Sequence, residues 1–128
     1  MADVSPTPVA GSADIHRIGG GSVENLRLKP AEAALAVPGI SVTKNPTPGD
    51  AAAQMRAAFP RATALHEAAK TVGTTSEASI RTTGFDIIAN PTNRLSNHHR
   101  IIHPDGAAGF TDENLAKLAE VFTNTTGH

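Results

Sequence analysis

The sequence predicts a single α+β domain, in which a small and mainly antiparallel β-sheet is flanked by helices. Its 128 residues are close to the commonest size of one domain, so we expect one hydrophobic core. Between Phe85 and Phe110, two short isoleucine-containing runs are separated by a loop with proline and asparagine, which is typical of a β-hairpin. Several other segments have the periodicity of amphipathic helices, and the two patterns together indicate the α+β class.

Residues 1–12 contain two prolines, a glycine and small side chains, which predicts a flexible N-terminal tail before a single domain at residues 13–128. The first residues carry neither the basic start nor the apolar run of a signal peptide, and no apolar window is long enough to span a membrane. We therefore expect no membrane partner, and a protein that is cytoplasmic or exported without a signal peptide.

The composition excludes several classes of site. Without cysteine, the chain forms no disulfide and no zinc-thiolate site. It has no tryptophan or tyrosine to stack on bases, and its formal net charge of -1 gives no basic surface for a nucleic acid. The composition therefore argues against nucleic acid as a partner.

The first strand is expected at residues 14–18. Because side chains alternate across a strand, Ile15 and Arg17 share one face, and His16 and Ile18 share the other. A guanidinium between two isoleucines in a core strand is costly to bury unless an acceptor meets it.

Arg17 therefore requires a partner, and two kinds remain open. One is a structural carboxylate such as that of Asp86 or Glu24. The other is an anionic ligand such as a phosphate, which a guanidinium binds in a bidentate manner.

Three glycines at positions 19–21 end this strand, but their spacing fits neither of the common phosphate-loop motifs. Residues 23–28 alternate weakly and predict a second strand. A short helix is expected over residues 29–35. The next strand covers residues 39–43, where Ser41 lies on the face opposite the apolar side chains of Ile40 and Val42.

Four further helices are expected. Residues 47–59 begin with a threonine N-cap and a proline at the first helical position. The second helix covers residues 62–71 and has Val72 on its buried face, and the third covers residues 75–82. The last runs over residues 111–122, where apolar side chains recur at helical spacing.

The second arm of the hairpin, residues 97–103, places polar side chains on a strand. His98 and Arg100 share one face, and His99 and His103 share the other. On an extended strand His99 and His103 are about 13 Å apart, too far to share one ion, so we expect no metal site.

Two chemical interpretations follow from the residues alone. Ser41 lacks the sequence context of a hydrolase nucleophile, which argues against a serine hydrolase. A pair of histidines that acts as acid and base on a phosphodiester, as in a ribonuclease toxin, remains open, because imidazole titrates near neutral pH.

Three stretches occur in a distinctive order along the chain. They are Ile15-His16-Arg17-Ile18, Gly39-Ile40-Ser41-Val42, and Asn97-His98-His99-Arg100-Ile101-Ile102-His103-Pro104 ahead of a C-terminal helix. In this order they resemble the small toxins that share a reduced ADP-ribosyltransferase fold, particularly an antibacterial effector family of the type VI secretion system. The resemblance implies an ADP-ribosyltransferase-like fold with a split sheet.

The resemblance also implies roles for four residues, and the strand that carries His98 offers Arg100 as a reserve. Arg17 would bind the phosphates or ribose of NAD, and Arg100 is a second candidate for NAD binding. Ser41 would support the cleft, and His98 or His99 would occupy the third, catalytic motif.

The function implied by the resemblance is that of a bacterial toxin that uses NAD, either as an ADP-ribosyltransferase or as an NAD glycohydrolase. Such an effector acts on a protein or nucleotide target and has an immunity protein as its partner. The alternative from another class is a non-enzymatic binding or inhibitor module that uses the same cleft as an interface.

Overall fold

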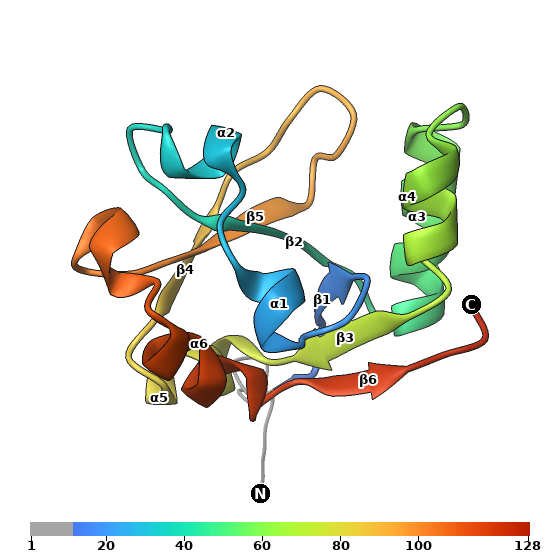
Figure 1. Ribbon diagram of the computed structural model, residues 1–128. Coiled ribbons are helices and arrows are strands. Elements are labelled where there is room, and N and C mark those ends of the chain that lie inside the picture. The colour runs from blue at the N-terminus through green and yellow to red at the C-terminus, as the bar shows by residue number, and fades with distance from the viewer. Residues whose placement is uncertain (1–11) are drawn as a thin grey trace, which may run out of the picture.

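The computed structural model describes residues 12–128 (Figure 1). Almost all of the predicted tail, residues 1–11, lies outside the described residues. The strands are β1 (Ile15–Ile18), β2 (Ile40–Lys44), β3 (Val72–Thr75), β4 (Asp86–Ala89), β5 (His98–Ile102) and β6 (Thr123–Thr125). The helices are α1 (Val23–Leu26), α2 (Pro30–Ala33), α3 (Pro48–Ala58), α4 (Thr63–Ala68), α5 (Glu77–Thr82) and α6 (Asp112–Ala119), and the 3-10 turn η3 is Gly106–Gly109.

All six strands belong to one antiparallel sheet with the order β4-β5-β2-β1-β3-β6. The predicted α+β class with an antiparallel sheet and flanking helices is therefore confirmed. The predicted hairpin is also confirmed, since β4 and β5 pair from Asp86 with Ile102 to Ala89 with His99. The loop between β4 and β5 carries Thr92 and Leu95, which line a cavity next to the sheet.

The pairing between β1 and β2 is short. It contains only the pairs Ile15 with Lys44 and His16 with Thr43, whereas β1 pairs with β3 along all four of its residues. Beyond His16 the two strands separate, and the ladder leaves the carbonyl of Ser41 free for a side chain. The side chain of Arg17 takes that place.

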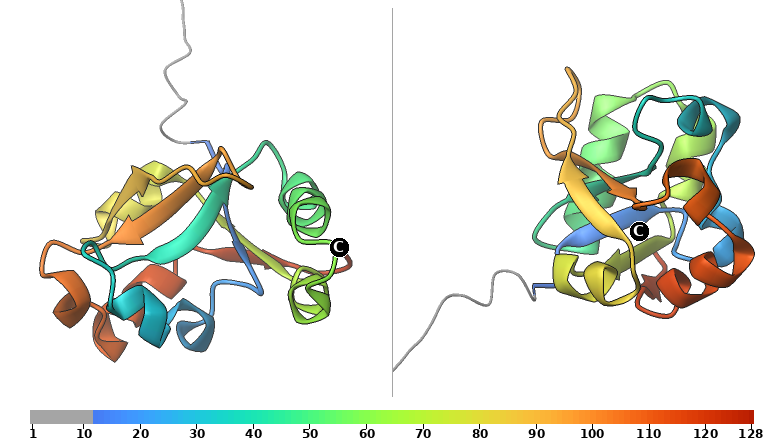
Figure 2. Two further views of the ribbon diagram at one scale, coloured as in Figure 1. Left: turned by 90° about the horizontal axis from the view of Figure 1, so that it is seen from above. Right: turned by 90° about the vertical axis from the view of Figure 1, so that its left-hand side faces the viewer.

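The two faces of the sheet pack against different helices. Ile15, Val42 and Ile101 belong to the larger core cluster, to which α1, α5 and α6 contribute Leu26, Ile80, Leu115 and Leu118. On the other face, a small cluster of Ala52, Ala69 and Val72 joins α3 and α4 to the sheet. Figure 2 shows α3 and α4 (green) set apart from the remaining helices.

Most of the predicted helices are confirmed, and their ends follow capping chemistry. Thr47 accepts a hydrogen bond from the amide of Asp50 at the start of α3, and Thr111 accepts one from Asn114 at the start of α6. Pro48 occupies the first turn of α3, where its missing N–H is tolerated. None of the helices in residues 12–128 is long and apolar enough to cross a membrane.

Two parts of the predicted pattern are wrong. Residues 23–28 do not form a strand, because Ser22 caps a helical turn at Val23–Leu26 by accepting from the amide of Asn25. Val72 does not extend the helix before it but begins β3, which in turn pairs with the unpredicted strand β6. The helix α5 accordingly begins at Glu77, with Ser76 as its N-cap, and not at residue 75.

Gly73 explains why a strand can form at this position. A Cβ atom there would lie 2.5 Å from the backbone nitrogen of Gly21 and 2.9 Å from the carbonyl carbon of Gly20. Only glycine permits the chain after β1 to approach β3 so closely.

Candidate functional site

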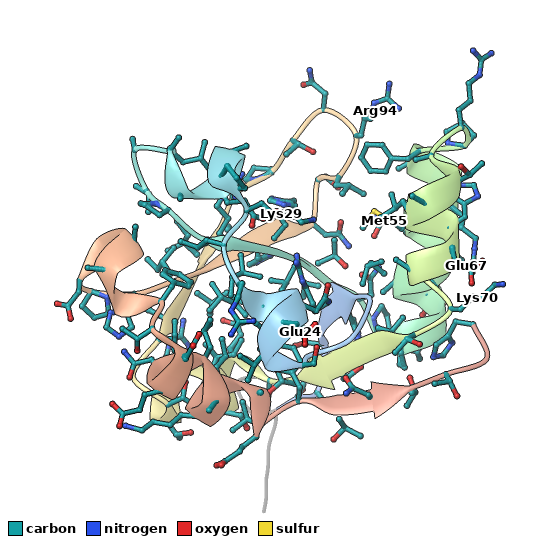
Figure 3. The ribbon with its side chains drawn as sticks, viewed as in Figure 1. Glu24, Lys29, Met55, Glu67, Lys70 and Arg94 are labelled. Carbon is teal, nitrogen blue, oxygen red and sulfur yellow. The ribbon has the colours of Figure 1, made fainter. Side chains whose placement is uncertain are left out.

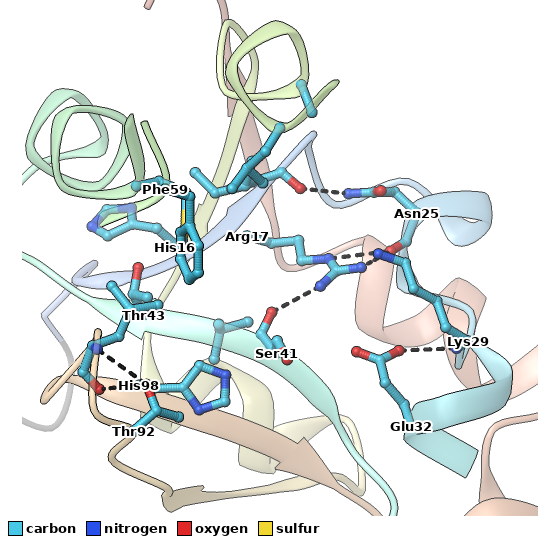
Figure 4. Close-up of a pocket in the computed structure, with 16 residues that line it drawn as sticks. His16, Arg17, Asn25, Lys29, Glu32, Ser41, Thr43, Phe59, Thr92 and His98 are labelled. Carbon is cyan, nitrogen blue, oxygen red and sulfur yellow. Dashed lines mark hydrogen bonds between the residues drawn. The ribbon is translucent and has the colours of Figure 1, made fainter. Parts of the chain in front are cut away.

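A cavity of about 360 Å³ lies above the place where β1 and β2 separate (Figure 4). Its floor comes from three strands, and its apolar wall comes from α3, α4 and their flanks. Its polar wall comes from α1 and from the start of α2. The floor residues are His16, Arg17, Ser41, Thr43 and His98, the apolar wall residues are Met55, Phe59, Leu65 and Ala68, and the polar wall residues are Asn25, Lys29 and Glu32.

Strand register brings most of the floor together. Thr43 is paired with His16 on one side and with His98 on the other, so the three side chains share a face of the sheet. Ser41 lies two residues from Thr43 and projects from the same face. Three polar positions that are far apart in the sequence therefore meet as neighbours.

Arg17 reaches the cavity differently, through the gap between β1 and β2. Its side chain is on the opposite face of β1 from His16, but Figure 4 shows the guanidinium between Ser41 and Asn25. The Nη1 donates to the carbonyl oxygen of Ser41 at 2.9 Å, while Nη2 and Nε donate to that of Asn25 at 2.7 and 3.2 Å. These bonds fix the guanidinium at the cavity.

The charge of Arg17 has no acidic partner among residues 12–128 within ion-pair distance. The residue is only 6% exposed, and burial lowers the pKa of its guanidinium, with the Glu32 carboxylate opposing that effect. Of the predicted partners, Asp86 pairs instead with Arg81, and Glu24 is exposed. Since a guanidinium has five N–H groups and three are used, two remain for a ligand.

His98 presents one free ring nitrogen. It is 7% exposed, and its Nδ1 lies 2.8 Å from the carbonyl oxygen of Asn90. Because a carbonyl only accepts, Nδ1 carries the proton and Nε2 is an acceptor, which makes no hydrogen bond to any described residue. Burial lowers the pKa of His98, and the charge of Arg100 acts in the same direction. At neutral pH the ring is therefore neutral and able to accept a proton.

His16 lines the same cavity but has no free nitrogen. Its Nε2 donates to the carbonyl oxygen of Asn45 at 2.9 Å, so Nδ1 accepts from the hydroxyl of Thr74, also at 2.9 Å. Burial lowers the pKa of His16, which favours this neutral ring. The residue is structural, and it does not supply the second imidazole that a histidine-pair ribonuclease needs.

Two hydroxyls on β2 are available to a ligand. Ser41 is half-buried, and its hydroxyl makes no hydrogen bond to the described part of the chain. Thr43 is only 1% exposed, and its Oγ1 is a buried polar atom without a partner in residues 12–128. An unpaired buried hydroxyl is costly, and a ligand group in the cavity would remove that cost.

Within residues 12–128, the polar wall carries one cation, Lys29, and one carboxylate, Glu32. The backbone amide of Lys29 donates to Oε1 of Glu32 at 2.9 Å, which holds the carboxylate at the start of α2. Neither side chain forms an ion pair with another described residue. Figure 4 shows both on the opposite side of the cavity from Phe59.

Two residues assigned to the site from the sequence lie elsewhere. His99 lies on the face of β5 that is turned away from the cavity. The Nδ1 of His99 contacts the carbonyl oxygen of Asn97 at 2.8 Å. Arg100 shares a face with His98, but its guanidinium donates to Asn90 and Gly39 instead of lining the cavity.

The three glycines after β1 offer no cradle for a phosphate. The amide of Gly19 donates to the carbonyl of Thr71, and that of Gly20 donates to the carbonyl of Arg17. The amide of Gly21 donates to the Oδ1 of Asn124. All three amides are used within the fold.

Sequence reasoning missed Lys29, Glu32 and Thr43 as site residues, and it placed position 59 only at the end of a predicted helix. A short exposed helix such as α2 has no pattern that indicates what it faces, so Lys29 and Glu32 gave no signal. Thr43 could have been found, because it alternates with Ser41 on the same predicted strand.

Comparisons of the chain with models of known protein families, with curated proteins and with solved structures found no match. The function must therefore be inferred from the cavity itself.

Proposed function

We propose that the cavity binds NAD and that the protein is a toxin that consumes it, by transferring ADP-ribose to a target or by hydrolysing the bond between nicotinamide and ribose. The observation that carries the proposal is the convergence of Arg17, Ser41 and His98 on one cavity. These residues come from three different strands, and the resemblance to ADP-ribosyltransferase-like toxins assigned roles to the same three.

The apolar and polar parts of the cavity suit the nicotinamide half of NAD, which has a planar ring at one end and a phosphate at the other. Met55 and Phe59 give an apolar surface for a planar ring, while Arg17 and Lys29 provide cations for a phosphate. The volume of about 360 Å³ is within the range of about 300–1,000 Å³ that is usual for small-molecule sites. A ligand with an aromatic end and an anionic end fits this distribution best.

The separation of β1 and β2 supports the proposed kinship with the ADP-ribosyltransferase fold. A split in the sheet is expected of that fold, and Arg17 lies where β1 and β2 cease to pair. In this proposal the opening admits the phosphate or ribose to the guanidinium.

The chemistry requires one bond to break and one to form. The bond between C1′ of the ribose and the ring nitrogen of nicotinamide breaks, and its electron pair goes to the ring, which leaves as a neutral molecule. Positive charge then develops on the ribose, and the carboxylate of Glu32 can stabilise it electrostatically. Water or a target nucleophile bonds to C1′, and the free Nε2 of His98 accepts its proton.

The test is release of nicotinamide from NAD, measured with and without a bacterial lysate as a source of target. Wild type is compared with His98→Ala, and His99→Ala is the matched control because it removes a neighbouring imidazole outside the cavity. We expect His98→Ala to reduce release by about 100-fold or more and His99→Ala to leave it near the wild-type rate.

Expression in bacteria supplies a second arm of this test. We expect wild type to arrest growth and folded His98→Ala protein to relieve the arrest. Harmless wild type that releases no nicotinamide would refute the NAD proposal and would favour the non-enzymatic binding module.

A further inference from the structure

A surface groove lies next to the cavity, at the C-terminal end of α3. It is lined by Phe59, Pro60, Arg61, Ala62 and Arg94, and Phe59 also belongs to the cavity wall. Figure 3 shows Arg94 beside this end of α3, beyond Met55. The groove and the cavity therefore share one aromatic side chain as a common boundary.

The loop between β4 and β5 contributes side chains to both the cavity and the groove. Thr92 and Leu95 of this loop face the cavity, whereas Arg94 between them in sequence faces the groove. A ligand that leaves the cavity between this loop and Phe59 would pass directly to Arg94.

Among the described residues, the lining of the groove contains two cations and no acid. The guanidinium of Arg94 lies 5.3 Å from the centre of the Phe59 ring, and its Nη1 donates to the carbonyl of Ala58 at 2.8 Å. These contacts hold an exposed side chain in one place without neutralising its charge. Arg61 is exposed, and within residues 12–128 its side chain makes no hydrogen bond or ion pair.

We infer that this groove is a second anion-binding subsite, which holds the distal phosphate-bearing half of a dinucleotide whose other half lies in the cavity. The inference rests on the proposed function, and it names the substrate class as a dinucleotide with two linked phosphates. A cavity of about 360 Å³ is at the small end of ligand sites, so a dinucleotide must extend beyond it. Arg61 and Arg94 lie where that extension emerges, and guanidinium groups suit phosphate oxygens.

The test compares the dissociation constants of NAD and of nicotinamide mononucleotide, measured by isothermal titration calorimetry. The mononucleotide has the nicotinamide, ribose and first phosphate, but lacks the half assigned to the groove. The variant is Arg61→Ala with Arg94→Ala, and the control is Arg27→Ala with Lys117→Ala, which removes two exposed cations elsewhere.

We expect the groove variant to weaken NAD binding about tenfold and mononucleotide binding less than about twofold, because the second phosphate contacts exposed cations. The control variant should change both constants less than about twofold. Equal weakening of both ligands, or no weakening of NAD, would overturn the groove subsite while leaving the cavity proposal intact. Wild type that binds neither ligand would overturn both.

Discussion

The guanidinium of Arg17 donates to the backbone carbonyl of Ser41 at 2.9 Å, where β1 and β2 have ceased to pair. A side chain thus replaces a ladder hydrogen bond and places a cation at the floor of the cavity. The same guanidinium holds α1 through the carbonyl of Asn25. One residue therefore links the strand separation, the position of α1 and the charge of the site.

Replacing Arg17 by lysine tests the structural part of this role. An ammonium keeps the charge but cannot donate to both carbonyls in the geometry of a guanidinium. We expect the free energy of unfolding to fall by about 1.5–3 kcal/mol, measured by urea denaturation. The control Arg27→Ala removes an exposed ion pair with Asp112 and should cost less than about 1 kcal/mol. Equal losses in the two variants would contradict the role of Arg17.

Thr43→Val separates stability from ligand binding. The change removes a buried hydroxyl that has no partner within residues 12–128 and nearly conserves shape. We expect the free energy of unfolding to stay unchanged or rise by up to about 1 kcal/mol, while the dissociation constant of NAD rises several-fold.

The matched control is Thr74→Val, because the hydroxyl of Thr74 donates to Nδ1 of His16. Its loss should lower the free energy of unfolding by about 1 kcal/mol. Destabilisation by Thr43→Val as large as that of Thr74→Val would show that the Thr43 hydroxyl is already satisfied by the fold.

The fold should lose stability in mild acid through its buried histidines. Burial lowers the pKa of His16 and of His98 in the folded state, so the unfolded chain binds protons more readily. The contribution of these two neutral histidines to the free energy of unfolding is fully present above the ordinary histidine pKa of about 6.5. It is lost as the pH falls below that value. The lowered pKa values of Glu77 and Asp86 act only at lower pH, where carboxylates protonate.

Urea denaturation between pH 8 and pH 5 measures this dependence. We expect His98→Gln to have a shallower dependence than wild type, since it removes one of the two groups. An unchanged slope would contradict a neutral, buried His98. In the same range, nicotinamide release should decline towards acid pH as His98 loses its free nitrogen.

Gly73→Ala tests the close approach of β3 to the glycine turn after β1. The added Cβ would lie 2.5 Å from the backbone nitrogen of Gly21, and backbone cannot move aside cheaply. We expect a loss of more than about 2 kcal/mol in the free energy of unfolding. Gly49→Ala in the first turn of α3 has its nearest atom at 3.8 Å and should be neutral or slightly stabilising. Similar effects of both changes would contradict this packing.

Local patterns predicted the parts of the site that depend on strand alternation. The faces of β1, β2 and β5 follow from a period of two residues, and this period places Ser41 and His98 on the cavity side. It also separates His98 from His99, so alternation alone could have chosen between them. The capping residue Thr47 likewise identified the start of α3.

The remaining features of the fold and the site depend on contacts between residues far apart in the sequence. Such contacts cannot be predicted from local patterns in a single sequence. The strand β3 is stabilised by pairing with β1 and β6, which overrides the helical pattern that ends at Val72. The structural partner considered for Arg17 was a carboxylate such as that of Asp86 or Glu24, but the separation of two strands supplied a backbone carbonyl instead. The cavity position of Glu32 depends on the packing of a helix only four residues long.

The central claim is that Arg17 and His98 contact NAD in one cavity, and NMR spectroscopy of their side chains tests it most directly. On titration with NAD, we expect shifts of the Arg17 guanidinium N–H signals and of the His98 ring nitrogens, with little change at His99. Saturating shifts at these two residues would agree with the account. Unchanged Arg17 and His98 signals at millimolar NAD would contradict it.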